Sequence, residues 1–259
     1  MTKPPLDAIG KVVYVLDVGW IEFTDMMPNP ILGRSGDMAI VNAARTSRLR
    51  ESKGEEADKN LLFYLMTNRH TTPFGMVEFK FRVYLHLFVR DQWVRHRTWS
   101  YNIQSLRYSK PKMDFYHPED WRLQNTVNKQ GSDGIVDDKM QEAIVERLWV
   151  NTLIDARTYI GSDLGALQSH FEGSGETFYN ALIEAGVTRE QARMFIPVNT
   201  YTTMVAKVDA HNLMRFLKLR LHPHAQWEIR QYAEAIYQHC FKPLLPWTAE
   251  AFEKFMLEK

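Results

Sequence analysis

The residues from Glu78 to Leu87 alternate between apolar and more polar side chains, and this run constrains the fold more than any other part of the chain. One side carries Phe79, Phe81, Val83, Leu85 and Leu87, and the other carries Lys80, Arg82, Tyr84 and His86. Because the side chains of a strand point alternately to its two faces, the run predicts a half-buried β-strand. From Phe88 the spacing becomes helical and would place Gln92, Arg95 and His96 on one helix face.

Other segments predict further elements around this strand. A β-rich run covers residues 12–16, and helices are expected over 38–44, 59–69, 140–159, 209–221 and 225–241, the last ended by Pro243. Thr248 is expected to cap a short final helix. Residues 117–139 and 161–175 are expected to be loop-rich insertions. Without an internal repeat or a low-complexity tract, we expect one domain over residues 1–259.

Composition limits the classes of protein to consider. The chain has 259 residues, 45% of them hydrophobic, and a net charge of +1. We therefore do not expect a protein whose entire surface binds nucleic acid, because such proteins are usually strongly basic. Cys240 is the only cysteine and is expected to be a small core residue. The first residues lack the apolar stretch of a signal peptide, and no apolar run is long enough to cross a membrane, so we expect a cytoplasmic protein.

Residues 95–108 combine three arginines, Arg95, Arg97 and Arg107, with a histidine and several small polar side chains, without any lysine or acid. Guanidinium groups have a fixed donor geometry that suits phosphate and carboxylate groups. The stretch therefore indicates a site for a phosphorylated ligand, to which Ser100, Asn102 and Ser105 would add neutral donors. A solvated basic loop or a set of structural ion pairs is the alternative. His96 fits either a packed histidine or a ligand contact.

A fourth arginine stands where a core residue is expected. In the predicted helix 209–221, one stripe consists of Leu213, Phe216, Leu217 and Arg220. Burying a guanidinium without a partner is costly. We therefore expect Arg220 to face an anion or a wet cleft.

Several common cofactor sites find no support in the sequence. The glycine-rich fingerprints of a Rossmann domain and of a P-loop are absent. The histidines that could suggest zinc are His211, His222, His224 and His239. They lack cysteine or carboxylate ligands at the usual spacings, so no metal site is expected.

The signature Arg95-His96-Arg97-x-x-Ser100-x-Asn102-x-x-Ser105-x-Arg107 resembles that of the flavin-dependent thymidylate synthases, the ThyX family. Further motifs stand in the order of the family: Ala44-Arg45-Thr46-Ser47, His70-Thr71-Thr72-Pro73-Phe74, Gln92-Trp93, Ala192-Arg193 with Pro197, and Leu219-Arg220 with residues 224–229. Together they cover most of residues 38–258 and leave 117–139 and 160–177 as family-variable insertions.

The resemblance implies an α+β fold, a mainly antiparallel sheet packed with helices, and a homotetramer with FAD sites between subunits. It implies methylation of dUMP to dTMP, with methylenetetrahydrofolate as carbon donor and FAD reduced by NADPH as hydride source. The implied dUMP contacts are Gln92, Arg95, Ser105, Leu106, Arg107 and Arg193, with Arg220 polarising the uracil as the catalytic residue. The implied FAD contacts are His70, Thr72, Arg95, His96 and Arg97, together with Ile103, Asp209, His211 and Arg215, where the sequence departs from the family.

These departures affect the expected chemistry. The usual glutamate after Asn102 is Ile103, which removes a carboxylate beside the pyrimidine and flavin, and Gly75 replaces a frequent glutamate. Asp209, His211 and Arg215 stand where some members carry Asn-x-Arg and then Asn.

Two alternative functions stay open. One is a flavoprotein relative that oxidises NADPH without methyl transfer. The other is a single-stranded nucleic-acid-binding module, in which Trp99, Tyr101 and Tyr108 would stack on bases beside the arginines.

Overall fold

The computed structural model describes residues 8–47, 49, 51–127, 131–151 and 164–257. Its internal contacts fall into two compact units, and we describe each unit by itself. Unit 1 comprises Met1–Leu85, Val89–Ile103 and Thr203–Lys259, and unit 2 comprises His86–Phe88 and Gln104–Thr202. The expectation of one family domain over the whole chain stays a prediction.

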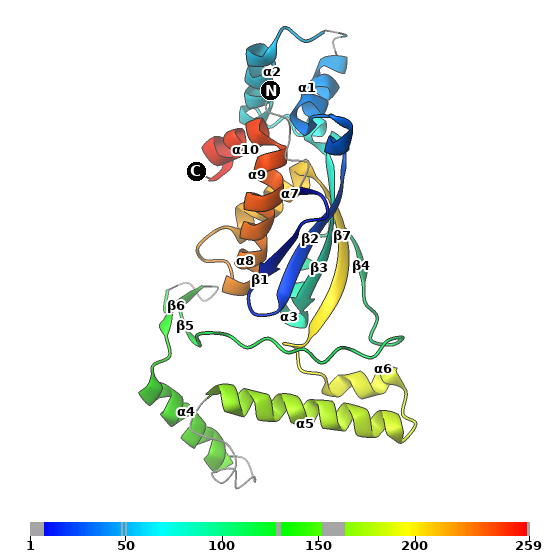
Figure 1. Cartoon of the computed structure of the whole chain (residues 1–259). Helices are drawn as coiled ribbons and strands as arrows, with labels where there is room; N and C mark the ends of the chain where they lie inside the picture. Colours follow the sequence, from blue (N-terminus) through cyan, green and yellow to red (C-terminus); the bar gives the residue numbers. More distant parts are fainter. Residues whose placement is uncertain (1–7, 48, 50, 128–130, 152–163, 258–259) are drawn as a thin grey trace. The chain divides into compact units, whose positions relative to one another are not determined.

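The centre of unit 1 is a five-stranded sheet (Figure 1). Its strands, in spatial order, are β1 (Val12–Val15), β2 (Gly19–Met27), β3 (Glu78–His86), β7 (Tyr201–Asp209) and β4 (Ser100–Ile103). The pairs β1–β2, β2–β3 and β4–β7 are antiparallel. This sheet with its helices confirms the expected α+β fold, and β1 confirms the β-rich run at residues 12–16, although Leu16 lies outside the strand.

Strand β3 confirms the alternating run, but the half-buried interpretation holds only for its first part. Tyr84 and His86, expected on the polar side, are buried as well. The ring of Tyr84 stacks on Trp20 of the neighbouring strand at 5.8 Å. The ring of His86 lies 4.0 Å from that of Phe88 and 4.6 Å from that of Tyr116. Aromatic neighbours therefore cover the second face of this central strand.

Several helices lie wholly or mostly in unit 1. They are α1 (Gly36–Thr46), α2 (Glu55–Thr67), α3 (Leu87–Trp93), α7 (Ala210–Arg220), α8 (Trp227–Ile236), α9 (Lys242–Leu244) and α10 (Pro246–Phe252). Helix α8 packs on β1 and β2 (Figure 1). The predicted helices near 38–44, 59–69, 209–221 and 225–241 are thus present. Short 3-10 helices cover Pro30–Leu32 and Thr72–Met76, and π-helical turns cover Tyr237–Phe241 and Glu253–Leu257.

Two predicted helix ends are wrong. Pro243 does not end a helix, because the π-helical turn Tyr237–Phe241 carries the chain directly into α9. Thr248 does not cap α10 from the N-cap position, since the helix already begins at Pro246. The cap comes instead from Asp37 of α1, whose carboxylate accepts hydrogen bonds from the N–H groups of Trp247 (2.9 Å) and Thr248 (3.1 Å).

Unit 2 contains a small hairpin and the remaining helices. They are β5 (Arg122–Gln124), β6 (Ser132–Ile135), α4 (Asp138–Asn151), α5 (Leu164–Glu184), α6 (Arg189–Ala192) and the 3-10 helix Arg193–Phe195. Its core joins Leu87, Leu106, Tyr179, Ala192 and Ile196. The predicted helix 140–159 is confirmed up to Asn151, and residues 152–159 lie outside the described residues.

The expectation of a loop over 161–175 is wrong where the structure describes it, because residues 164–175 belong to α5. The glycines in this stretch favoured a loop, but tertiary packing overrides the low helix propensity of those in α5. A Cβ atom at Gly175 would lie 2.6 Å from the carbonyl oxygen of Phe195. At this position glycine permits the close approach of α5 to the following 3-10 helix. Within the described part of the chain, no helix combines the length and the apolar character needed to cross a bilayer.

Candidate functional site

The chain turns sharply after α3, between Trp93 and Ser100. The N–H of His96 donates to the carbonyl of Trp93 at 3.0 Å. The hydroxyl of Tyr101 on β4 lies 3.0 Å from the carbonyl oxygens of both Trp93 and His96, so its single hydrogen is shared between them. The arginine-rich stretch therefore begins at a helix end, as predicted. Arg95 and His96 lie in the turn, however, and the predicted helix face shared with Gln92 is wrong.

Arg220 is the last residue of α7 and completes its buried stripe. Leu213, Phe216 and Leu217 are fully buried, whereas the guanidinium of Arg220 is half-buried. Its Nε donates to Nε2 of His96 at 3.0 Å. The protein group that faces Arg220 is thus a histidine ring and not a carboxylate.

His96 is uncharged at neutral pH. Burial, followed by the positive charges of Arg220 and Arg215, lowers the pKa of His96 to about 4. Because Nε2 accepts the hydrogen bond from Arg220, we assign the single ring proton to Nδ1. Burial also lowers the pKa of Arg220, but a guanidinium remains charged at any physiological pH. The neutral ring of His96 therefore does not neutralise the positive charge of Arg220.

Aromatic rings pack around the pair of His96 and Arg220. The ring of Phe216 lies 4.9 Å from that of Trp93, 5.1 Å from that of Trp99 and 4.9 Å from that of His96. Trp93 and Trp99 are buried, so this packing fixes both the turn and the end of α7. Trp99 is consequently unavailable as a stacking platform for a base.

Three further arginines of unit 1, Arg95, Arg97 and Arg215, are exposed. They make no ion pair with any carboxylate among the residues that the structure describes. Other arginines of the same unit do form ion pairs, which join Arg45 to Asp58, Arg82 to Glu22 and Arg90 to Asp91. Structural ion pairs therefore do not explain Arg95 and Arg97, and their charges are available to an anionic ligand.

The other predicted flavin contacts lie on separate segments of unit 1. His70 and Thr72 are exposed at the start of the 3-10 helix Thr72–Met76, and the ring of His70 lies 5.8 Å from that of Tyr64. Ile103 is half-buried at the end of β4, opposite Met204. The structure therefore places a half-buried apolar side chain at this position.

Asp209 and His211 stand at the beginning of α7. The carboxylate of Asp209 caps the helix by accepting from the backbone N–H of Asn212 (2.9 Å) and from its Nδ2 (2.6 Å). For His211, burial and the charge of Arg215 lower the pKa, whereas Asp209 raises it, and the net shift is downward. The lowered pKa favours the neutral form of His211, and Asp209 already has a structural role.

Gln92, on the last turn of α3, has one unsatisfied group. Its Oε1 atom is buried and finds no hydrogen-bond donor in the described part of the protein. Burying an acceptor without a partner costs free energy, so a ligand that supplies a donor here would be stabilised.

The predicted residues of unit 2 lie on a turn and on a helix end. The N–H groups of Tyr108 and Ser109 both donate to the carbonyl of Ser105 at 3.1 Å, which closes the turn. Leu106 packs in the same core as Ala192. This packing joins the turn that carries Arg107 to the end of α6, which Arg193 follows directly. Arg193 is exposed.

Arg107 makes an ion pair that the sequence did not suggest. Its Nη2 lies 3.2 Å from Oε2 of Glu190, and both side chains are about half exposed. The arginine expected to hold a phosphate is thus paired with a carboxylate here. A local signal existed, because Glu190 stands three residues before Arg193 and thus brings a carboxylate close to a predicted phosphate-binding arginine. Tyr101 was likewise missed as an anchor of the turn.

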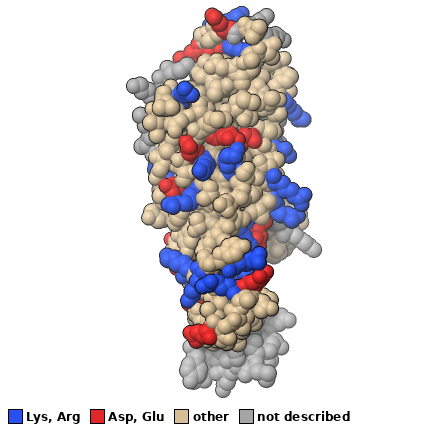
Figure 2. All heavy atoms as spheres, turned by 90° about the vertical axis from the view of Figure 1, so that its right-hand side faces the viewer, with Lys and Arg blue, Asp and Glu red and all other residues tan. Residues whose placement is uncertain are grey.

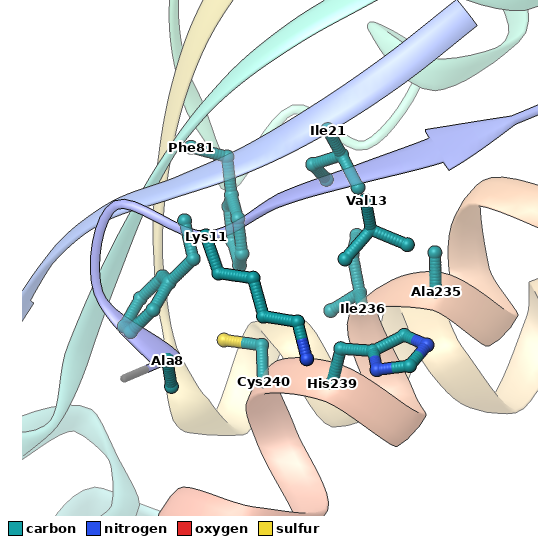
Figure 3. Close-up of a pocket in the computed structure, with 10 residues that line it drawn as sticks. Ala8, Lys11, Val13, Ile21, Phe81, Ala235, Ile236, His239 and Cys240 are labelled. Atoms are coloured by element: carbon teal, nitrogen blue, oxygen red, sulfur yellow. The ribbon is translucent and has the colours of Figure 1, made fainter. Parts of the chain in front are cut away.

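A small pocket lies between strands β1–β3 on one side and α8 with the π-helical turn Tyr237–Phe241 on the other (Figure 3). Its lining includes Lys11, His239 and Cys240, and none of the predicted site residues. About 10 Å³ of space is room for a single water molecule. Cys240 is buried, and its burial raises the pKa of the thiol, which confirms a neutral core cysteine.

The histidines considered for zinc do not converge. His222 and His224 lie close, with ring centroids 5.1 Å apart. Among the described residues, no group of three histidine, cysteine, aspartate or glutamate side chains is arranged to hold a metal ion. On the face shown in Figure 2, basic side chains form separate patches interrupted by acidic and uncharged ones.

The fold is an antiparallel sheet packed with helices, the turn after α3 carries Arg95 and Arg97 without a carboxylate partner among the described residues, and Arg220 at the end of α7 pairs with a neutral histidine. The family model "Thymidylate synthase complementing protein" matches residues 33–247. The chain belongs to this family, that of the flavin-dependent thymidylate synthases.

Individual relatives agree with this membership. The chain is 44% identical over 244 residues to a flavin-dependent thymidylate synthase of Thermus thermophilus, an alignment that covers 94% of this chain and 79% of the relative. It is 38% identical to that of Rickettsia conorii, with 100% and 84% covered. Among solved structures, the UMP/dUMP methylase PolB of Streptomyces cacaoi, bound with 5-Br UMP, gives a TM-score of 0.72 at 28% identity and covers 93% of this chain and 96% of its own.

Proposed function

We propose that this chain methylates dUMP to dTMP, with methylenetetrahydrofolate as the carbon donor and with FAD that NADPH reduces. The membership in the family supports the reaction class. The observation that carries the proposal for this chain is the pairing of Arg220 with a neutral histidine. A guanidinium whose only protein partner in the described structure is uncharged keeps its charge for the ligand.

The residues present fit FAD. Its diphosphate needs positive charge, and Arg95, Arg97 and Arg215 are exposed without carboxylate partners in the described part of the chain. His96, His70 and Thr72 would add contacts, as would His211, Ile103 and Asp209 at the positions where the chain departs from the family. Bound FAD, once reduced, supplies the hydride that completes the methyl group.

The dUMP contacts divide by chemistry. Arg107 and Arg193 would neutralise the phosphate, because a guanidinium binds a phosphate through paired N–H donors. Ser105 and Leu106 belong to the same turn as Arg107. In unit 1, Gln92 and Arg95 would bind the nucleotide, with the buried Oε1 of Gln92 accepting a donor from it.

Arg220 would act on the pyrimidine. Negative charge develops on the uracil ring when its N3 proton is lost or when a hydride arrives, and a fixed cation beside the ring stabilises that charge. The half-buried position of Arg220 strengthens this interaction relative to water. No cysteine nucleophile is needed in this proposal, which agrees with the buried, neutral thiol of Cys240.

We also propose that the protein assembles as a homotetramer in the cytoplasm, with active sites between subunits. Unit 2 exposes a set of large apolar side chains on α5 and after α6, which supports self-association: Phe171, Phe178, Met194, Phe195 and Val198. No nucleic acid or membrane partner is proposed.

Absorption spectroscopy tests the proposal. The purified protein is loaded with FAD, reduced with NADPH without oxygen, and then mixed with dUMP and methylenetetrahydrofolate. The flavin band should appear, bleach, and return together with dTMP. If FAD does not bind the folded protein, the proposal fails.

The second candidate function is a flavoprotein that oxidises NADPH without methyl transfer, and Ile103 favours it. An apolar side chain at this position removes a group that could move a proton or order water. Bound flavin that NADPH bleaches, without any dTMP after both substrates are added, would support this candidate.

A nucleic-acid-binding module is the remaining alternative, and Trp99 argues against it because this side chain is buried in the core. Salt dependence separates the two modes. A strand binder loses affinity steeply as salt rises, whereas a mononucleotide site shows a shallow slope.

A further inference from the structure

One contact of the site joins two residues 124 positions apart in the sequence. The Nε–H of Arg220 donates to Nε2 of His96 at 3.0 Å. This is the only hydrogen bond that Arg220 makes with its side chain among the residues described. The two Nη groups, with four N–H donors, therefore remain for a ligand.

The acceptor is held in place on several sides. The carbonyl of His96 accepts from Tyr101 (3.0 Å) and from the N–H of Trp99 (3.2 Å). The imidazole ring packs edge-on against Phe216, at an interplanar angle of 68°. Phe216 lies one turn before Arg220 on α7. The same helix therefore supplies both the aromatic ring that packs on His96 and the guanidinium that donates to it.

The hydrogen bond also requires one protonation state. A protonated imidazole has no lone pair and would repel the guanidinium, whereas a neutral ring with its proton on Nδ1 accepts from Nε. Arg215 and Arg220 both face His96 from α7 and favour the neutral ring, and no carboxylate contributes to its electrostatics. The bond is thus stable throughout the neutral pH range.

We propose that His96 is a positioning residue for Arg220: its ring holds the Nε edge of the guanidinium and thereby fixes the Nη groups in one orientation for the pyrimidine. The inference rests on the proposed function, in which Arg220 stabilises charge on the uracil. It differs from a role of His96 as a flavin contact, because its effect passes through Arg220. Without the bond, the terminal torsions of Arg220 are released, and a small misplacement of a catalytic group is costly in rate.

A matched pair of amide variants tests the proposal. In His96→Gln, the amide reaches approximately the place of Nε2, whereas in His96→Asn the amide ends near the place of Nδ1. We expect His96→Asn to lower kcat about 10- to 100-fold at saturating FAD, which is more than it weakens FAD binding, and His96→Gln to recover most of the loss of kcat. Equal losses in both variants, or losses that follow FAD affinity, would overturn the proposal.

A double variant separates the inference from the proposed function. In an Arg220→Ala background, His96→Asn should cause no further loss of kcat, because its effect requires Arg220. Multiplicative losses would show that His96 acts independently. If the wild-type protein forms no dTMP, the proposed function fails. The contact is then tested by NMR exchange of the Arg220 Nε–H, which should be protected in the wild type and in His96→Gln but not in His96→Asn; equal exchange in all three would refute the contact itself.

Discussion

Arg107 and Glu190 form an ion pair in unit 2, although they lie 83 residues apart in the sequence. Nη2 of Arg107 and Oε2 of Glu190 are 3.2 Å apart, and the side chains are 48% and 55% exposed. The carboxylate occupies the type of position that a phosphate group would take on this guanidinium. A phosphate bound at Arg107, as proposed above, would therefore compete with Glu190, and solvent exposure keeps this competition weak.

Glu190→Gln should raise the affinity for dUMP by about 1.4- to 5-fold, because an exposed ion pair contributes about 0.2–1 kcal/mol. Calorimetric titration of the flavin-loaded protein with dUMP measures the effect. Glu184→Gln, at an exposed position of α5, is the control and should leave the affinity unchanged. A lower affinity in Glu190→Gln would show that Glu190 orients Arg107 and does not compete with the ligand.

Arg220→Ala should retain FAD and lose most of the turnover, on the order of 100- to 1,000-fold, because the charge beside the pyrimidine is removed. Steady-state dTMP formation and the flavin absorption measure the two properties. Lys218 is exposed on the same helix, so Lys218→Ala is a control with a similar change of charge. Turnover that is unchanged in Arg220→Ala would remove this residue from the mechanism.

Cys240→Ser should remain active, because the thiol is buried and neutral and takes no part in the proposed mechanism. The buried hydroxyl should lower the free energy of unfolding by about 1–3 kcal/mol. Cys240→Ala, which buries no polar atom, checks that the loss comes from the hydroxyl. Folded Cys240→Ser protein that cannot form dTMP would contradict the proposed mechanism.

Asp37 should make stability depend on pH. Burial raises the pKa of Asp37 to about 6, although hydrogen bonds from Thr248 and Trp247 act in the opposite direction. An unfolded aspartate has a pKa of about 3.9. The folded state thus binds the proton more tightly, so its contribution is complete below about pH 4 and is lost as the pH rises through about 6.

The difference in unfolding free energy between wild type and Asp37→Asn should therefore decrease by about 2 kcal/mol from pH 4 to pH 7. Urea unfolding at several pH values measures this difference. Asp120→Asn removes a carboxylate at an exposed position and serves as the control. A difference that increases with pH would mean that the hydrogen bonds hold Asp37 ionised against the effect of burial.

The sequence predicted the elements whose patterns are local. Alternation identified β3, and the helical stripe identified α7 together with the unusual position of Arg220. The glycine-rich beginning of α5 was misjudged because its helix depends on packing around Gly175. Strands β2, β4 and β7 were not predicted, although buried and less buried side chains alternate along β2 and β7.

Partners that are distant in sequence could not be predicted. The hydrogen bond between Arg220 and His96 depends on where α7 ends relative to the turn after α3. The cap that Asp37 provides for α10 spans 210 residues. Each residue type suggested a need for a partner, but only the fold determines which residue meets that need.

Tritium release from dUMP labelled at C5 tests the central claim most directly, because methylation replaces the hydrogen on that carbon. Purified, flavin-loaded protein should release tritium to water and form an equal amount of dTMP. Both should require NADPH and methylenetetrahydrofolate together. Consumption of NADPH without tritium release or dTMP would contradict the account and would establish an oxidase in place of a thymidylate synthase.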